Sequence, residues 1–306
     1  MAIQTKEGAQ RLPLELFLLA LVAFFWGAQF GFTKIQLETM PPFTAVSLRL
    51  AFAALFMWVI VWSQGVTVPT GVRSWRDFTI QGILTSAGPG ILIAWGQQYV
   101  DSALAAILTS LSPIVVTIIT LLYTRQESIG IKRVLGLALG FCGVITVIGF
   151  GALEGLDRGF VGQLVIMLAT LGYASATLFG RRFTHISPLG AAAATTTASA
   201  VLMLILAFII EQPFSADPST RSLLATAASG ILANGIGVTI YFRLIRTLGS
   251  LGTSTVSFLK AAFGVVIGCF VLGEPFTASI VIGLAAVLIG VVAINEPGGS
   301  KAKPKS

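Results

Sequence analysis

One lysine, Lys260, stands in the middle of the otherwise uncharged run VSFLKAAFGVVIG. An ammonium group at the centre of a lipid bilayer costs roughly 2.5–3.5 kcal/mol, so such a residue normally faces protein or a water-filled cavity. Lys260 is ten residues from Ser250 and twelve from Leu272, the ends of its apolar stretch, so its stem reaches neither membrane surface. We expect it to face a central cavity as the partner of an anionic group or an ordered water. The alternative is a buried lysine whose donors are satisfied by helix-end carbonyl groups.

Polar and aromatic residues recur at intervals of three and four along several apolar stretches, and residues at that spacing share one face of a helix. The face that holds Lys260 also carries Thr253, Ser257 and Gly264. The comparable faces are Gly230, Asn234, Gly237 and Tyr241; Trp26, Gln29 and Thr33; Ile91, Trp95 and Gln98; and Thr170, Tyr173 and Thr177. Faces of this kind are expected to form the wall of a cavity.

The candidate substrate-binding residues are those near these faces whose side chains offer a charge, a hydrogen bond or an aromatic ring. They are Lys260, Ser257, Asn234, Tyr241, Trp26, Gln29, Tyr173, Trp95, Gln98 and Tyr99. A structural role is the alternative for most of them, because Ser, Thr, Asn and Gln bond across to neighbouring membrane helices and Trp and Tyr anchor helices at the interface. Trp95, Gln98 and Tyr99 are expected to lie near one membrane interface. Anchoring at that interface explains these residues as well as substrate binding does.

Prolines interrupt two apolar stretches near their middles, at Pro89, flanked by Gly88 and Gly90, and at Pro113. Proline removes a backbone hydrogen bond and kinks a helix, which membrane helices tolerate where neighbours or a cavity satisfy the freed carbonyl groups. Pro89, Gly90 and Pro113 are therefore hinge candidates, with a static kink as the alternative. Arg49, six residues into its stretch, either snorkels outward or makes a gating or substrate contact near the outer mouth.

Several kinds of catalytic site are absent from the sequence. No GxxxxGK[ST] phosphate-binding loop occurs, and a chain with one histidine, His185, has no HExxH metal site. The interiors of the apolar stretches contain no Asp or Glu, which argues against a magnesium–diphosphate site and against a proton relay through buried carboxylates. The sequence predicts no enzyme activity, no cofactor and no bound metal.

The elements that position these residues follow from composition. Of the 306 residues, 55% are hydrophobic and 10% are charged, and the mean hydropathy is +0.92, values typical of an integral membrane protein. An α-helix needs about 20 apolar residues to cross the hydrocarbon. Ten stretches meet this length, at 14–33, 43–63, 78–100, 102–123, 131–150, 161–179, 188–210, 222–244, 250–272 and 276–294.

Basic residues set the expected orientation. If both termini are cytoplasmic, fourteen Lys and Arg residues fall on that side and three, Lys34, Arg158 and Arg221, on the other. Such an excess is the positive-inside pattern. The net charge of +7 therefore reports topology and attraction to the lipid bilayer, and we expect no nucleic-acid partner.

The chain contains an internal repeat. An offset of 147 residues places Pro41 on Pro188 and Glu127 on Glu274, and aligns five further identical residues. The predicted domains are a cytoplasmic tail (1–13), a first five-helix repeat (14–150), a linker (151–160), a second five-helix repeat (161–296) and a basic cytoplasmic tail (297–306). Because five is odd, the second repeat enters the membrane from the opposite side, an inverted arrangement common among secondary transporters.

Three runs carry a resemblance to a known family: FFWGAQFGFTK, SLSPIVVTIITLLYTRQE and VLGEPFTASIVIGLAAVLIGV. They resemble the ten-helix, EamA-type branch of the drug/metabolite transporter superfamily. The overall pattern is also similar to that of the YddG-type exporters of aromatic amino acids. The resemblance implies an all-α polytopic fold, a central cavity lined by spans one to four and six to nine, and spans five and ten packed outside. Spans five and ten carry glycines at spacings that allow close packing, which suggests a homo-oligomer contact as one use.

The resemblance implies a secondary transporter in the bacterial inner membrane that exports small organic metabolites by alternating access. Amino acids, aromatic ones among them, are the first expectation, since aromatic walls and one fixed cation would suit such molecules. A multidrug or other-metabolite facilitator of the same fold and a channel-like protein are the alternatives.

Overall fold

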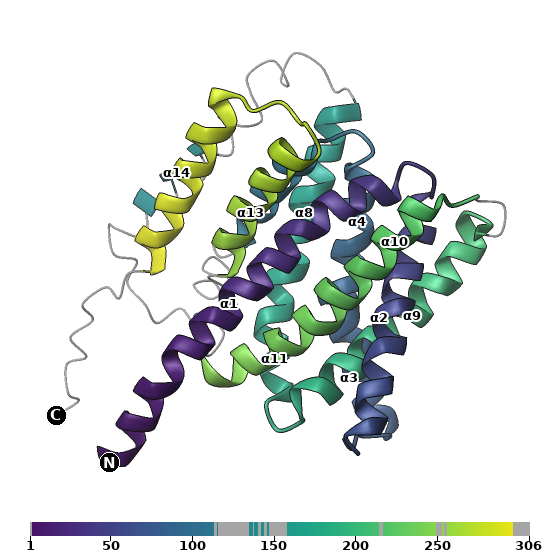
Figure 1. Cartoon of the computed structure of the whole chain (residues 1–306), viewed down its shortest axis with the longest axis vertical. Helices are drawn as coiled ribbons and strands as arrows, with labels where there is room; N and C mark the ends of the chain where they lie inside the picture. The colour runs from purple at the N-terminus through teal and green to yellow at the C-terminus, as the bar shows by residue number, and fades with distance from the viewer. Residues whose placement is uncertain are drawn as a thin grey trace.

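The computed structural model describes residues 2–112, 158–213, 217–248 and 256–295, and the single positions 115, 135, 136, 138, 139, 142, 143, 146 and 253. Every regular element there is a helix (Figure 1). The first half contains α1 (Ala2–Gln36), α2 (Pro42–Ser63), α3 (Val72–Gly82), η1 (Ile83–Ala87), α4 (Gly88–Gly96) and α5 (Ser102–Thr109). The second half contains α8 (Arg158–Phe179), η3 (Gly180–Phe183), α9 (Pro188–Ile210), α10 (Thr220–Ser229), η5 (Gly230–Gly237), α11 (Val238–Thr247), α13 (Val256–Val271) and α14 (Ala278–Asn295).

Six helical segments in the described part of the chain are long and apolar enough to cross a membrane. They are Pro13–Gln36, Pro42–Ser63, Val72–Gly96, Arg158–Phe183, Pro188–Ile210 and Thr220–Thr247, and they coincide with predicted spans one, two, three, six, seven and eight. Helices α13 and α14 occupy spans nine and ten. Most of spans four and five, with Pro113, lies outside the described residues. The chain is an all-helical, multi-pass membrane protein, as predicted.

Helix α1 is longer than predicted, because the helix begins at Ala2 and not at residue 14. Residues 2–12 are mostly good helix formers that continue the first span. Pro13 lies within α1, where it removes one backbone hydrogen bond without ending the helix. The predicted N-terminal tail is therefore helical.

The two halves pack against each other by exchange of helices. Helix α2 lies along α9, and α5 lies along α13. Helix α1 packs on α10, η5 and α11 of the second half, while α8 packs on η1 and α4 of the first half. An offset of 147 residues relates the contacts of α1 with η5 and α11 to those of α8 with η1 and α4, as expected for repeats related by a pseudo-two-fold axis. Helix α14 lies at the edge of the bundle, where it packs on α5 and α13 (Figure 1).

Two glutamates of the second half cap helices of the first half. Glu211, which follows α9, accepts the first two backbone N–H groups of α2 at 2.9 and 2.7 Å and the Thr44 hydroxyl at 3.0 Å. Glu274, which follows α13, accepts the first two N–H groups of α5 at 2.8 and 2.9 Å and the Ser102 hydroxyl at 2.6 Å. A carboxylate suits a helix N-terminus because free N–H groups and the helix dipole both favour negative charge. Both caps fix antiparallel helix pairs across the repeat boundary.

Small residues allow α1, α13 and α5 to cross closely. A Cβ atom added at Gly264 would overlap the Ala106 side chain, and one added at Gly27 would lie 2.6 Å from the Phe263 Cβ and 2.9 Å from the Gly264 backbone nitrogen. Close backbone approach of this kind gives membrane helices their packing contacts, because lipid supplies no hydrophobic driving force between them. The α13 helix that carries Lys260 is thus held against two helices of the first half.

Two π-helical segments interrupt the third and eighth spans at matching positions. Segment η1 precedes Pro89, and η5 lies one repeat offset further along the chain. A π-turn widens the helix and leaves carbonyl groups without their usual partners, and such turns are frequent at functional sites. In η5 the Ala233 carbonyl accepts the indole N–H of Trp26 on α1, at 3.0 Å. This bond ties the first span of one half to the irregular turn of the other.

The close crossing at Gly264 gives a first prediction. We expect Gly264→Val to lower the stability of the folded protein by about 1–3 kcal/mol or more, because the added atoms meet Ala106 and have no room to shift. The measurement is thermal or SDS-induced unfolding of the purified protein in detergent. Gly71→Ala is the matched control, since a Cβ atom at Gly71 meets nothing within 4 Å. Equal stabilities of the two variants would contradict the packing described here.

The indole contact gives a second prediction. We expect Trp26→Phe to destabilise the protein by about 1–3 kcal/mol, because the buried Ala233 carbonyl loses its donor. Trp62→Phe is the control, because Trp62 is exposed on the outer surface of α2 and should change stability by less. Unfolding in the same detergent measures both. A Trp26→Phe protein as stable as the control would show that η5 does not need this donor.

Candidate functional site

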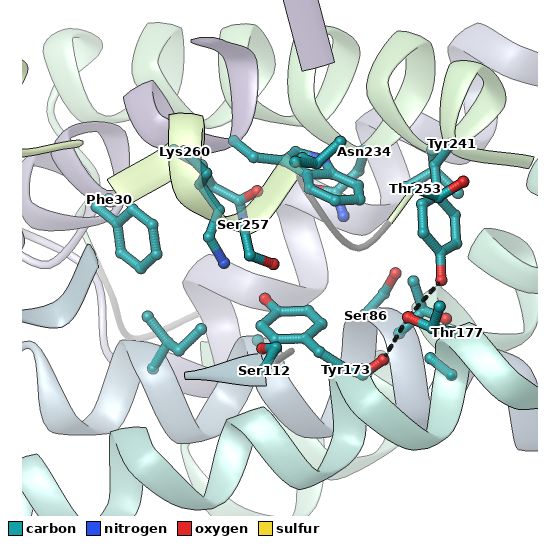
Figure 2. A pocket seen from close by; sticks show the side chains of 18 of the residues that line it. Phe30, Ser86, Ser112, Tyr173, Thr177, Asn234, Tyr241, Thr253, Ser257 and Lys260 are labelled. Carbon is teal, nitrogen blue, oxygen red and sulfur yellow. Dashed lines mark hydrogen bonds between the residues drawn. The ribbon is translucent and has the colours of Figure 1, made fainter. Parts of the chain in front are cut away.

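A central pocket collects most of the predicted binding residues. Helices α1, α8 and α13 line it, together with the two broken spans η1–α4 and η5–α11. Seven of the ten predicted residues lie in its wall: Lys260, Ser257, Asn234, Tyr241, Trp26, Gln29 and Tyr173. The pocket therefore lies where the two halves meet, and both contribute side chains to it (Figure 2).

Lys260 lies deep in this wall with 4% of its surface exposed. Its ammonium nitrogen is 4.9 Å from the centre of the Tyr173 ring and 5.6 Å from the centre of the Phe30 ring. Figure 2 shows the side chain between the two rings, with Ser257 one turn away on the same helix. Aromatic faces attract a cation but do not neutralise its charge. Among the residues that the structure describes, no carboxylate lies within ion-pairing distance of Lys260.

A hydroxyl chain forms another part of the wall. The Tyr241 hydroxyl on α11 donates to the Thr177 hydroxyl on α8 at 3.2 Å, and Thr177 donates to the Tyr173 carbonyl at 2.9 Å (Figure 2). The Tyr241 ring also lies 5.5 Å from the Trp26 ring. Helices α1, α8 and α11 therefore present a connected group of aromatic and hydroxyl side chains to the pocket.

Asn234 presents an acceptor without a donor. The residue lies in the π-helical turn η5, is 5% exposed and lines the pocket. Its Oδ1 atom is buried and has no hydrogen-bond partner in the described part of the chain. Because a buried polar atom without a partner costs about 1–3 kcal/mol, this atom is available to a donor on a bound molecule.

Arg49 points inward and does not snorkel. The residue is 1% exposed, and its Nη1 atom donates to the Thr33 hydroxyl at 3.3 Å. Its Nη2 atom fits against Gly90, where an added Cβ atom would lie 2.9 Å away. Both Thr33 and Gly90 line the pocket. The outward alternative from the sequence is wrong, because the missing side chain of Gly90 leaves room for the guanidinium inside the bundle.

Trp95, Gln98 and Tyr99 do not line this pocket. The Trp95 and Tyr99 rings pack edge to face at 5.4 Å, and Arg158 lies over the Tyr99 ring at 5.9 Å. Gln98 and Tyr99 are exposed near the end of α4. These positions agree with the alternative interpretation, in which the three residues anchor the helix at the membrane interface. Of the hinge candidates, Gly90 lines the pocket and Pro89 is buried beside it.

Some lining residues were not identified from the sequence as site residues: Phe30, Thr85, Ser86, Ile93, Ser112, Ala176, Val238 and Val256. A signal was present for several of them. Phe30 follows Trp26 by one helical turn, and Ser86 lies in the stretch that Pro89 breaks. Ser112 directly precedes Pro113. The described residues contain no group of three or more His, Cys, Asp or Glu side chains that could hold a metal ion.

The arrangement suits reversible binding of a small molecule. One charged group, several hydroxyl and amide groups and four aromatic rings converge on a pocket between two halves. Sites of this kind, which are mostly apolar with a few placed polar groups, are typical of small-molecule binding.

Comparisons with known proteins agree with this architecture. A solved crystal structure has the same fold, with a TM-score of 0.67 at 18% identity over 92% of this chain and 97% of that one. The uncharacterized transporter YoaV of Bacillus subtilis (strain 168) is 23% identical over 271 residues, which are 88% of this chain and 92% of that protein. The uncharacterized inner membrane transporter YedA of Escherichia coli (strain K12) is 24% identical over 289 residues, 94% and 92% of the two chains. Protein PagO of Salmonella typhimurium is 25% identical over 296 residues, 94% and 96% of the two chains.

The model of the EamA-like transporter family matches the sequence twice, over residues 13–149 and 160–296. The two matches follow each other along the chain and together cover most of it. Each contains helices that build the pocket. The chain belongs to the EamA-like transporter family, within the drug/metabolite transporter superfamily.

Proposed function

We propose that this protein is a secondary transporter that exports small organic metabolites, amino acids and aromatic ones among them, by alternating access. The observation that carries the proposal is the position of Lys260, a buried cation without a described carboxylate partner, in a pocket built by both halves. A substrate carboxylate would supply the missing negative charge, and the rings of Phe30, Tyr173 and Trp26 would contact an apolar side chain.

Contacts between the halves at both ends of the bundle support a mechanism with two gates. At one end Glu15 on α1 accepts from Arg243 on α11 at 2.8 Å and from the Thr247 hydroxyl at 3.0 Å. At the other end Glu211 and Glu274 of the second half accept backbone N–H groups of the first half, from Thr44 at 2.7 Å and from Ser102 at 2.8 Å. In alternating access one set of such contacts opens while the other holds, so the pocket faces one side at a time.

The charge distribution supports an orientation with both termini in the cytoplasm of a bacterial inner membrane. In this orientation the Glu15–Arg243 contact belongs to the cytoplasmic gate, and the two capping glutamates, Glu211 and Glu274, belong to the outer one. Transport by this route changes the position of the substrate and none of its bonds.

The test is counterflow of labelled amino acids in proteoliposomes, offered one at a time. We expect saturable exchange by the wild type. We expect Lys260→Ala and Lys260→Met to raise the half-saturating concentration by about 10- to 100-fold, which is the effect of losing one charge-assisted hydrogen bond. Arg221→Gln is the control, because it removes an exposed cation that pairs with Glu38 outside the pocket.

The outcomes separate the alternatives. Exchange that survives both Lys260 substitutions unchanged would make this lysine a structural residue. Flux that does not saturate would favour a channel-like protein. Folded protein that exchanges no amino acid at all would contradict the amino-acid assignment and favour a facilitator of other metabolites. Monodisperse elution from a sizing column shows that each variant is folded.

A further inference from the structure

We infer that the pocket prefers a substrate with a net negative charge, an aromatic or apolar organic acid that lacks an ammonium group, over the zwitterionic amino acid of the same skeleton. The inference rests on the proposed transport function and refines its substrate class. It starts from two buried cations, on opposite halves of the protein, that adjoin one pocket without a described carboxylate between them.

The first cation is Lys260, whose ammonium group touches the faces of two aromatic rings. In the described part of the chain, cation–π contacts with Tyr173 and Phe30 are the interactions recorded for its nitrogen. Such contacts are worth about 0.5–2 kcal/mol, and they leave the ammonium donors without acceptors. An anion in the pocket would meet those donors directly.

The second cation is Arg49, which comes from α2 and lies behind the part of the wall that Thr33 and Gly90 form. Its guanidinium lies against Thr33 and Gly90, both of which line the pocket. Its Nε atom is buried and has no hydrogen-bond partner among the residues that the structure describes. The two cations therefore adjoin the pocket from different helices, Lys260 from α13 and Arg49 from α2 behind Thr33 and Gly90, and both contribute a positive potential to it.

Carboxylates that could balance these charges lie elsewhere. In the described residues, acidic side chains pair at the two ends of the bundle: Glu15 with Arg243, Asp77 with Arg76, Asp101 with Lys34 and Glu38 with Arg221, while Glu211 and Glu274 cap helices. Asp217 is exposed. The sequence has no Asp or Glu at 102–126, 128–153 or 249–273, so spans four, five and nine add no carboxylate. Among the described residues, neither cation therefore has a carboxylate as its counter-charge, and an anionic ligand would supply one.

Charge then decides between two molecules of the same shape. An organic anion brings one negative charge to two cations in a medium of low dielectric, where such an interaction is strong. A zwitterion brings the same carboxylate together with an ammonium group, which the two cations repel. Asn234 Oδ1 offers that ammonium group one neutral acceptor, and this acceptor serves a hydroxyl or amide N–H of an anion equally well. A 2-hydroxy acid therefore satisfies Asn234 without adding positive charge.

A net anion also removes the need for a proton relay. The cytoplasm is electrically negative, so the membrane potential itself drives an anion outward. One net charge moving through 100 mV gains about 2.3 kcal/mol, an equilibrium concentration ratio of about 50-fold. Export of a single anion would need no coupling ion, which agrees with span interiors that contain no acidic residue.

The test compares matched pairs that differ by one group. Wild-type proteoliposomes receive labelled phenylalanine or phenyllactate, tryptophan or indolelactate, and leucine or 2-hydroxyisocaproate, with phenethylamine as the cation of the series. A potassium diffusion potential set with valinomycin drives uptake, and protein-free liposomes correct for leakage of the neutral acid. We expect a hydroxy acid to saturate at concentrations at least about 10-fold lower than its amino acid, and to accumulate up to about 50-fold at 100 mV, inside positive.

Substitutions test whether the two cations cause this preference. Lys260→Met and Arg49→Met each remove one charge, and we expect each to reduce the preference for the hydroxy acid at least about 10-fold. Arg49→Lys keeps the charge and should keep most of the preference. Arg221→Gln again controls for loss of a positive charge outside the pocket. If Arg49→Met does not fold, the effect of Lys260→Met on the substrate preference and the voltage response of the wild type still test the inference.

Each result has a defined meaning. A hydroxy-acid preference that follows the potential and falls in the Met variants supports the inference. Saturable transport of the amino acids with equal or better affinity, and no response to potential, overturns it while the transport function stands. Transport of phenethylamine also overturns it. If none of the seven compounds moves through folded wild-type protein, the proposed function fails and the inference fails with it.

Discussion

The free energy of a positive charge inside the bilayer governs the rest of this structure. Lys260 and Arg49 are both almost fully buried, and a bare charge at this depth is several kcal/mol unfavourable. Helices must therefore surround both groups with polar and aromatic side chains and leave room for a counter-charge. The small residues bring α13 close to α1 and α5, and the π-helical turns place Asn234 and Ser86 in the pocket wall, so that polar groups surround this region.

The symmetry of the chain explains which parts form the wall. Equivalent helices meet across the pseudo-two-fold axis, so the pocket receives one broken span and one long helix from each half, together with α13 of the second half. The chemistry is not symmetric, because Pro113 occupies the position that corresponds to Lys260 and Thr196 the one that corresponds to Arg49. The repeated fold thus gives the site its shape. Residues that occur in one half but not at the equivalent position of the other half give it its charge.

Much of the fold and part of the site could be predicted from the sequence. Apolar length predicted the described spans to within a few residues at most ends, and α9 matches its prediction at both ends, because helix length in a membrane follows bilayer thickness. Helical spacing predicted seven pocket residues. It failed for Trp95, Gln98 and Tyr99, because periodicity gives the face of a helix but not its depth in the membrane. The direction of Arg49 was left open between snorkelling and an inward contact, because its position depends on Gly90, a contact between two helices that no single-helix pattern contains. The turn η5 was missed because it has no proline, only glycines beside Asn234.

The exchange of helices between halves has a consequence for biogenesis. The α2 helix enters the membrane during synthesis long before α9. Its N-terminal N–H groups therefore lack their carboxylate acceptor until Glu211 of the second half has been synthesised. Helix α5 likewise lacks its N-terminal cap until Glu274, more than 160 residues later in the chain, has been synthesised. The first half is therefore an assembly intermediate with open helix ends, which the second half completes. A ribosome that stops at the linker would release a membrane-inserted chain without its partner surfaces, so we expect quality-control proteases to recognise the isolated first half readily, and co-expression of the second half to protect it.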